Sequence, residues 1–211
     1  MQNPSLPNPE TNQKGYTIIE LGIALTIIAV LIVAGLAGVT TVLNNSKANS
    51  QIEESGIVLA KLQSTLTSTS VSGMTTAVAV GSSYFPTSRV SGTGSTTAVA
   101  SRFNGSEFVR SNSTALTATE GVVAAIGGGA IYTITGVPRA VCANIATSLA
   151  TLANAAWIYN ATPDEGTSGA VTNLTAATTQ IKAPGGQVQG ARVGTQCNLA
   201  DTVSLAFFLR P

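Results

Sequence analysis

The sequence predicts an α+β fold in which one long N-terminal helix packs on an antiparallel sheet. Three observations lead to this prediction. An apolar run begins near Tyr16, an amphipathic helical pattern continues it to about residue 66, and apolar strand-like runs follow in the C-terminal half. With 211 residues, 44% of them hydrophobic, the chain is long enough to bury a core in one or at most two domains.

Residues 1–15 form a polar segment with three prolines and two charged side chains. Such a segment offers too little apolar surface to pack a core. The composition changes at Tyr16, and from Leu21 to Leu43 no residue is charged. Because about 20 consecutive apolar residues suffice for a helix to cross the hydrocarbon core of a bilayer, the sequence predicts a membrane-spanning helix over residues 16–43.

Two simpler interpretations of this N-terminus stay open. Small residues at Gly35 and Ala37 follow an apolar stretch, and signal-peptidase cleavage near Ala37 would release a secreted binding domain. Three features weigh against such cleavage: the leader is long and rich in proline, Glu20 stands where positive charge is expected, and the helical pattern continues past residue 37. The second interpretation is a permanent single-pass anchor.

Glu20 is the one charged residue between Tyr16 and Leu43. An unpaired carboxylate within an apolar helix costs about 2.5–3.5 kcal/mol on membrane insertion scales. Cleavage between Gly15 and Tyr16 would create an α-amino group one helical turn away, in the same chain or in a neighbouring copy. A carboxylate at the membrane interface, near the positive end of the helix dipole, is the simpler alternative.

Residues 44–69 continue the helix with an amphipathic pattern. One apolar stripe repeats at helical spacing: Ala48, Ile52, Leu59, Leu62 and Leu66. Residues 16–66 would therefore form one helix of about 76 Å at 1.5 Å per residue. The many serines and threonines after Ser64 end it, because their hydroxyls compete for backbone hydrogen bonds.

Residues 70–211 are expected to form a globular head. Strands are predicted at Thr76–Val80, Phe108–Val109, 130–137 and Val203–Leu209. Pro138 suits the first turn of a helix, and apolar side chains at helical spacing run from Val141 to Ala156, ending near Trp157. Since the C-terminal run is strongly apolar, we expect it to lie centrally in one antiparallel sheet that packs on the second half of the long helix.

Cys142 and Cys197 are the only cysteines. An even number of cysteines beside an export segment indicates one disulfide formed in an oxidising compartment. Two unrelated buried thiols are the alternative at this point.

The stretch KGYTIIEL, residues 14–21, followed by the apolar helix, resembles the N-terminus of a type IV prepilin. In that family a prepilin peptidase cuts after the glycine and methylates the new N-terminus, which implies processing at Gly15 and Tyr16. The fifteen-residue leader resembles that of the type IVb branch, whereas Tyr16 departs from the usual aliphatic first residue. AVCANIATSLATL and TQCNLADTVSLAFFLR resemble the borders of the type IVb D-region, which implies a Cys142–Cys197 disulfide.

This resemblance implies the type IV pilin fold and a structural function. Residues 1–15 would be a cleaved leader, residues 16–43 the membrane anchor and filament core, residues 44–69 an amphipathic helix and residues 70–211 the head. The chain would be the major subunit of a type IVb pilus of the bundle-forming, toxin-coregulated or conjugative thin kind, with Glu20 neutralising the N-terminal amine of a neighbouring subunit. A minor pilin or a type II secretion pseudopilin is the alternative within the family.

The resemblance also implies partners and a location. The precursor would lie in the inner membrane, in contact with lipid, prepilin peptidase and the pilus assembly machinery, with its head in the periplasm. The mature chain would then form a helical homo-oligomer outside the cell, for which adhesion, conjugation, motility and DNA uptake all fit.

Composition argues against an enzyme and against a metal or cofactor site. The chain has no histidine and no Ser-x-x-Lys motif, so its many hydroxyls lack the usual activating groups. Two cysteines cannot form a structural zinc site, and the acidic calcium loop of major pseudopilins is missing. A net charge of +1 gives no broad surface for nucleic acid. The acidic pairs Glu53/Glu54 and Asp164/Glu165 are expected to be solvated.

Overall fold

The structure is a computed structural model that describes residues 15–68, 71–112, 124–125, 127–160 and 178–211, with Ala37 described by its backbone alone. The chain divides into two compact units, Met1–Val42 and Leu43–Pro211. The elements are, in chain order, α1 (Ile18–Ser68), α2 (Thr76–Gly81), η1 (Thr87–Arg89), β1 (Val90–Ser91), η2 (Gly94–Thr96), β2 (Ala98–Ala100), β3 (Ser106–Ser111), β4 (Ala130–Pro138), α3 (Arg139–Ala150), β5 (Ala155–Tyr159), β6 (Gln180–Lys182), α4 (Gly190–Cys197) and β7 (Thr202–Leu209).

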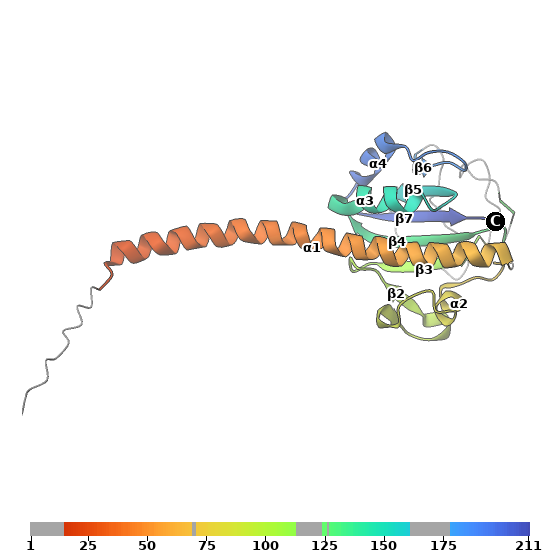
Figure 1. Ribbon diagram of the computed structural model, residues 1–211, viewed down its shortest axis with the longest axis horizontal. Helices are drawn as coiled ribbons and strands as arrows, with labels where there is room; N and C mark the ends of the chain where they lie inside the picture. The colour runs from red at the N-terminus through yellow and green to blue at the C-terminus, as the bar shows by residue number, and fades with distance from the viewer. Residues whose placement is uncertain (1–14, 69–70, 113–123, 126, 161–177) are drawn as a thin grey trace, which may run out of the picture. The chain divides into compact units, whose positions relative to one another are not determined.

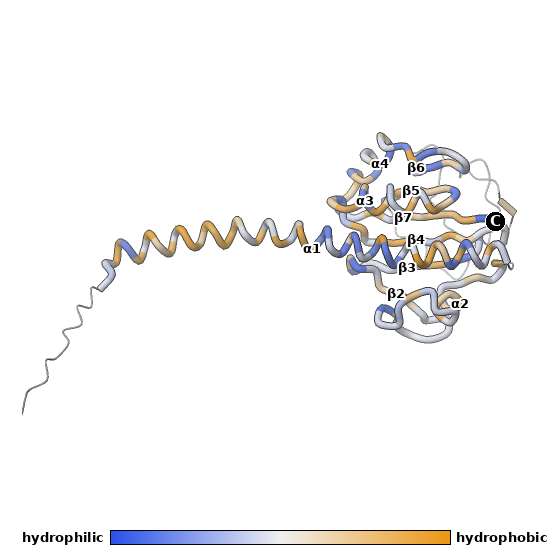
Figure 2. The backbone as a smooth tube through the Cα atoms, in the orientation of Figure 1, coloured by the Kyte–Doolittle hydropathy of each residue, from blue (hydrophilic) through white to orange (hydrophobic). Residues whose placement is uncertain are grey.

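The long predicted helix is confirmed as α1, a single helix of 51 residues (Figure 1). The residues of its first half are mostly apolar, as the orange and pale colours of Figure 2 show, and their large side chains are exposed in the single chain. By length and composition alone, α1 contains a segment able to cross a membrane. Near the C-terminal end, the Thr67 and Ser68 hydroxyls donate to the Ser64 carbonyl at 2.8 and 3.0 Å. This is the hydroxyl competition expected to end the helix.

The second half of α1 buries the predicted apolar stripe against the head. Ala48, Leu59 and Leu62 are fully buried, Leu66 is nearly so, and Ile52 packs at the edge of the same core. This part of the helix lies along β3 and β4 (Figure 1), and side-chain hydrogen bonds join it to both strands. The amphipathic pattern therefore identified the correct face.

The sheet has seven strands in the order β1-β2-β3-β4-β7-β5-β6, and every neighbouring pair is antiparallel. The C-terminal strand β7 lies between β4 and β5, where Leu205 faces Ile134 on one side and Ile158 on the other. The central position expected for the C-terminal run is thus confirmed. Strands β3 and β4 contain the predicted segments Phe108–Val109 and 130–137.

Both edges of the sheet are short. β1 has two residues and β6 has three. On β6, the Ile181 carbonyl accepts from the Gln189 backbone N–H at 2.8 Å, and the Gln180 carbonyl accepts from the Arg192 guanidinium at 3.0 Å. Residues at the start of α4 therefore bond to backbone carbonyls of this edge strand.

Two predicted elements are wrong. Residues 76–80 belong to the helix α2 and not to a strand, because Thr75 caps its N-terminus by accepting from the Val78 N–H at 3.3 Å. The helix predicted to reach Ala156 ends at Ala150, and Ala155–Tyr159 form β5. The Lys182 ammonium donates to the carbonyls of Ala150 and Ala153 at 2.8 and 2.7 Å and so satisfies the end of α3. Pro138 is the N-cap residue that directly precedes α3.

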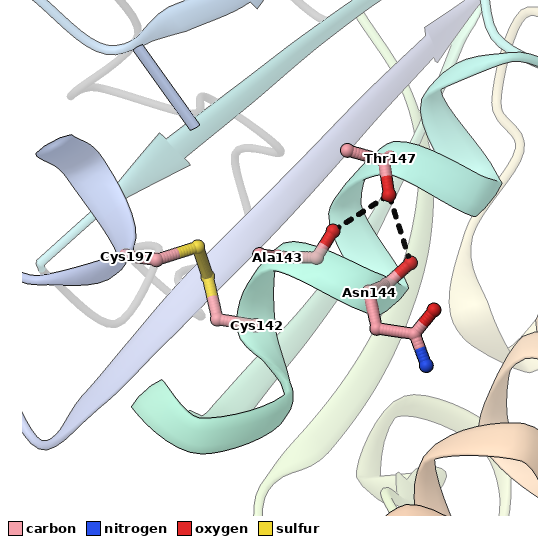
Figure 3. The surroundings of a disulfide bond; sticks show 5 residues. All are labelled: Cys142, Ala143, Asn144, Thr147 and Cys197. Atoms are coloured by element: carbon pink, nitrogen blue, oxygen red, sulfur yellow. Dashed lines mark hydrogen bonds between the residues drawn. A yellow bond between two sulfur atoms is a disulfide. The ribbon is translucent and has the colours of Figure 1, made fainter. Parts of the chain in front are cut away.

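A disulfide joins Cys142 of α3 to Cys197, the last residue of α4, with their Cα atoms 5.7 Å apart (Figure 3). Both residues are buried. The disulfide encloses β5, β6 and α4, so the predicted disulfide-bounded C-terminal region is confirmed. On the chain-entropy model, closing a loop of this length contributes about 4 kcal/mol.

Candidate assembly and processing site

Gly15, Tyr16 and Glu20 lie at the start of α1. Gly15 and Tyr16 precede the helix, and the Tyr16 side chain is 80% exposed. Thr17 directly precedes α1, and its hydroxyl accepts from the Glu20 backbone N–H at 3.3 Å. Thr17 therefore acts as an N-cap, and Glu20 occupies the third helical position, where a carboxylate is favoured by the helix dipole.

The position of Glu20 near the positive end of the helix dipole was considered from the sequence, but its bond to the Thr17 hydroxyl was not predicted, although the sequence carries the signal. Thr17-x-x-Glu20 has the spacing of a capping box, in which a threonine and an acid flank the first turn of a helix. Half of that box, the bond to the Thr17 hydroxyl, is present. Glu20 itself is exposed and forms no ion pair with any described residue.

The first half of α1 offers a large apolar surface that begins at this site. Among its exposed side chains, Ile18 is 90% accessible and Ile28 is 51% accessible. Soluble monomers seldom expose a continuous apolar surface of this kind, which marks membrane contact or association with other chains. The helix passes through Gly35 and Ala37 without interruption.

A buried polar cluster joins α1 to the sheet, and sequence reasoning missed it. Glu107 of β3 is fully buried and pairs with Arg89. Glu54 of α1, expected to be a solvated acid, instead pairs with Arg89 and Arg102, and its side chain is 19% exposed. Burial and the neighbouring Glu107 carboxylate raise the pKa of Tyr132, which is also buried. Two acids and two arginines far apart in the sequence gave no local pattern from which this cluster could be found.

Within the described residues, no group of three or more acidic or cysteine side chains is arranged to hold a metal ion. Cys142 and Cys197 are joined to each other, and the acidic pair Asp164/Glu165 lies outside the described residues. Of the predicted site residues, the fold brings together Cys142 and Cys197, whereas Gly15, Tyr16 and Glu20 lie near one another because they are close in the sequence.

Comparison with known proteins supports the fold. No family model matches the chain, and no curated protein matches it in sequence. Among solved structures, it is similar to the type IVb pilin from Salmonella typhi, with 15% identity and a TM-score of 0.51. The match covers 77% of this chain and 99% of that one. A long N-terminal helix, an antiparallel sheet and a C-terminal disulfide together define this class, so the chain has the type IV pilin fold.

Proposed function

We propose that this chain is a structural subunit of a type IVb pilus, made as a membrane-anchored precursor and polymerised through the first half of α1. One observation carries the proposal: a helix with exposed apolar side chains on every side leads into a head of the pilin fold. A helix that is apolar all round needs lipid or other helices as neighbours. A pilin subunit uses both in turn, first as precursor and then in the filament.

Processing would occur between Gly15 and Tyr16. The motif KGYTIIEL supports cleavage here by a prepilin peptidase, followed by methylation of the Tyr16 amine. The bond also lies outside regular secondary structure, since α1 begins at Ile18. A peptide bond in extended backbone is easier for a peptidase to bind than one inside a helix, and residues 35–37 lie inside α1.

Assembly would pair Glu20 with the new Tyr16 amine of a neighbouring subunit. Glu20 has no ion-pair partner among the described residues of its own chain, so this carboxylate is available to another one. Breaking a buried ion pair by removing one partner costs about 3–5 kcal/mol. In an apolar filament core the pair would therefore favour one axial stagger of neighbouring helices over others.

The precursor would lie in the inner membrane with its head in the periplasm, where the Cys142–Cys197 disulfide can form. Its partners there would be lipid, the prepilin peptidase and the assembly machinery. The mature chain would then be part of an extracellular helical filament made of copies of itself.

The N-terminal sequence and intact mass of protein sheared from cells test this proposal. We expect sheared filaments whose subunits begin at methylated Tyr16. As a control, Gly15→Val should leave the leader attached and yield no filaments, while the head keeps its disulfide. A soluble, non-filamentous product beginning at Gly38 would contradict the proposal and favour the secreted binding domain.

A further inference from the structure

The second half of α1 contacts the head through two kinds of surface. Toward its C-terminal end the contact is apolar, with Val58, Leu59 and Leu62 fully buried. Toward its N-terminal end the contact is mixed, because the polar side chains Gln51 and Ser55 are fully buried next to the small Ala48. Buried polar side chains need partners, and here the partners come from separate parts of the head.

Glu107 of β3 is the centre of the polar contact. Its Oε1 accepts from Gln51 Nε2 at 2.9 Å, and its Oε2 accepts from Tyr132 Oη at 2.6 Å. The Ser55 hydroxyl lies 2.8 Å from both Gln51 Nε2 and Tyr132 Oη, which completes a ring of hydrogen bonds between α1, β3 and β4. A fully buried carboxylate with these partners has a fixed geometry with respect to the helix.

Arg89 of η1 supplies the positive charge that Glu107 requires. Its Nη1 pairs with Glu107, and its Nη2 lies 2.8 Å from Glu54 Oε2 on α1. The same Nη1 donates to the Ala100 carbonyl at 3.1 Å. The Arg89 side chain is only 10% exposed, so one guanidinium joins the helix, the sheet and the strand β2 while shielded from water. Arg102 adds a bond from its backbone N–H to Gln51 Oε1 at 3.0 Å.

These two surfaces constrain the helix differently. Apolar contacts depend on the area removed from water and are not directional, so a small slide of the helix changes them gradually. The polar contact is directional, and a slide by one residue would leave Glu107 buried without its partners. The polar residues therefore determine the register of α1 on the sheet more strictly than the apolar stripe does.

We propose that Gln51, Glu54, Ser55, Arg89, Glu107 and Tyr132 form a latch that holds residues 47–56 of α1 on the head in a single register. Without the latch this segment detaches, while the apolar segment, residues 58–66, stays docked. Residues 47–56 open before residues 58–66, because local opening begins where few apolar contacts hold an element. The latch is a property of the single chain and does not depend on filament assembly.

Two buried positions report separately on the two segments. Ala48 lies in the latch segment and Val58 in the apolar segment, and both are fully buried. Cysteine is close in size to either residue, and Cys142 and Cys197 are already joined, so a maleimide would label only the introduced thiol. The experiment measures the labelling rate of Ala48→Cys and Val58→Cys in the full chain in detergent micelles.

We expect Arg89→Leu to raise the labelling rate at position 48 by at least about tenfold, the change in an opening equilibrium that loss of one charged hydrogen bond produces. The labelling rate at position 58 should change by less than about twofold, because the apolar segment stays docked on the head. Glu53→Gln is the matched control, because Glu53 is exposed and forms no ion pair with any described residue. It should leave both rates unchanged.

A milder substitution keeps the test decisive if Arg89→Leu does not fold. Glu54→Gln removes one arm of the latch and leaves the Arg89–Glu107 pair in place, so it should raise the rate at position 48 alone, by less than Arg89→Leu would. Equal acceleration at positions 48 and 58 would overturn the proposal, since it would show general destabilisation. Unchanged rates at both positions in a folded latch variant would overturn it as well.

Discussion

The two halves of α1 share one helical backbone and differ in where their apolar side chains find neighbours. In the first half, apolar residues on all sides are exposed in the single chain, as at Leu25 with 58% accessibility. In the second half, one stripe is buried and the opposite side is polar. The pattern of hydrophobic residues therefore distinguishes two kinds of helix. One with a single apolar stripe can bury it against its own chain, whereas one that is apolar all round needs neighbours from outside.

The polar residues of the two halves differ in the same way. Gln51 and Ser55 in the second half have hydrogen-bond partners from β3 and β4. Glu20 in the first half has no ion-pair partner among the described residues. Because an acid within an apolar helix is costly unless it is paired, the function proposed above gives this one charge a partner from another chain.

The largest expected effect concerns this unmatched acid. Glu20→Gln should abolish filament formation, because losing a buried ion pair costs about 3–5 kcal/mol at each added subunit, more than two orders of magnitude in the equilibrium constant. The melting temperature of the head should not change. Filaments sheared from cells and thermal unfolding of the purified chain give the two measurements. Glu53→Gln, the same substitution in the second half, should assemble normally; filaments from Glu20→Gln would show that no such pair is needed.

The next effect is a difference between the two halves of α1 in how much each contributes to the stability of the head. Leu62→Ala should lower the free energy of unfolding of the head by about 2–5 kcal/mol, because it leaves a cavity under a fully buried side chain. Leu25→Ala, the same substitution in the first half, should leave this free energy unchanged. Denaturant unfolding in detergent micelles can follow the fluorescence of Trp157, the only tryptophan, which is buried in the sheet. Equal losses from both variants would refute the distinction between the halves.

The effect that is smallest per tyrosine and per pH unit is a loss of stability at alkaline pH, caused by Tyr132 at the polar contact and by Tyr159 of β5. Burial raises the pKa of Tyr132 and of Tyr159 above the ordinary value of 10.0. Above pH 10 an unfolded tyrosine loses its proton while the buried one keeps it, so the folded state binds more protons and stability falls as the pH rises. The loss should approach about 1.4 kcal/mol per pH unit for each of the two tyrosines.

Urea unfolding between pH 9 and pH 12 measures this dependence. Tyr132→Phe should remove about half of the slope that the two buried tyrosines cause, since Tyr159 is then the one of the two that still ionises on unfolding. A slope that stays the same in this variant would mean that Tyr132 does not keep its proton in the folded chain.

Sequence reasoning was most accurate where one local pattern decides the structure. The stripe from Ala48 to Leu66 identified the buried face of α1, and the apolar run at the C-terminus identified the central strand β7. Sequence reasoning was wrong where the contacts of an element come from residues far away in the chain. α3 ends at Ala150, whose carbonyl accepts from Lys182 far along the chain, and no local pattern near Ala150 indicates this bond.

The same distinction applies to the candidate sites. Gly15, Tyr16 and Glu20 were predicted because they lie close together in the chain at the start of an apolar helix. Glu107 and Arg89 are separated by the turns and strands between η1 and β3, and only the folded sheet brings them to Gln51. Processing at Gly15 and pairing at Glu20 remain predictions.

The short edges of the sheet have a consequence for copies of the chain that lie close together. An open strand edge is a template on which another chain can extend the sheet, and packed copies at high local concentration invite fusion of this kind. Here β1 has only two residues, and the carbonyls of Gln180 and Ile181 on β6 are already bonded to residues at the start of α4. In the filament that we propose, many heads could therefore lie side by side without joining their sheets, while the apolar half of α1 holds the copies together.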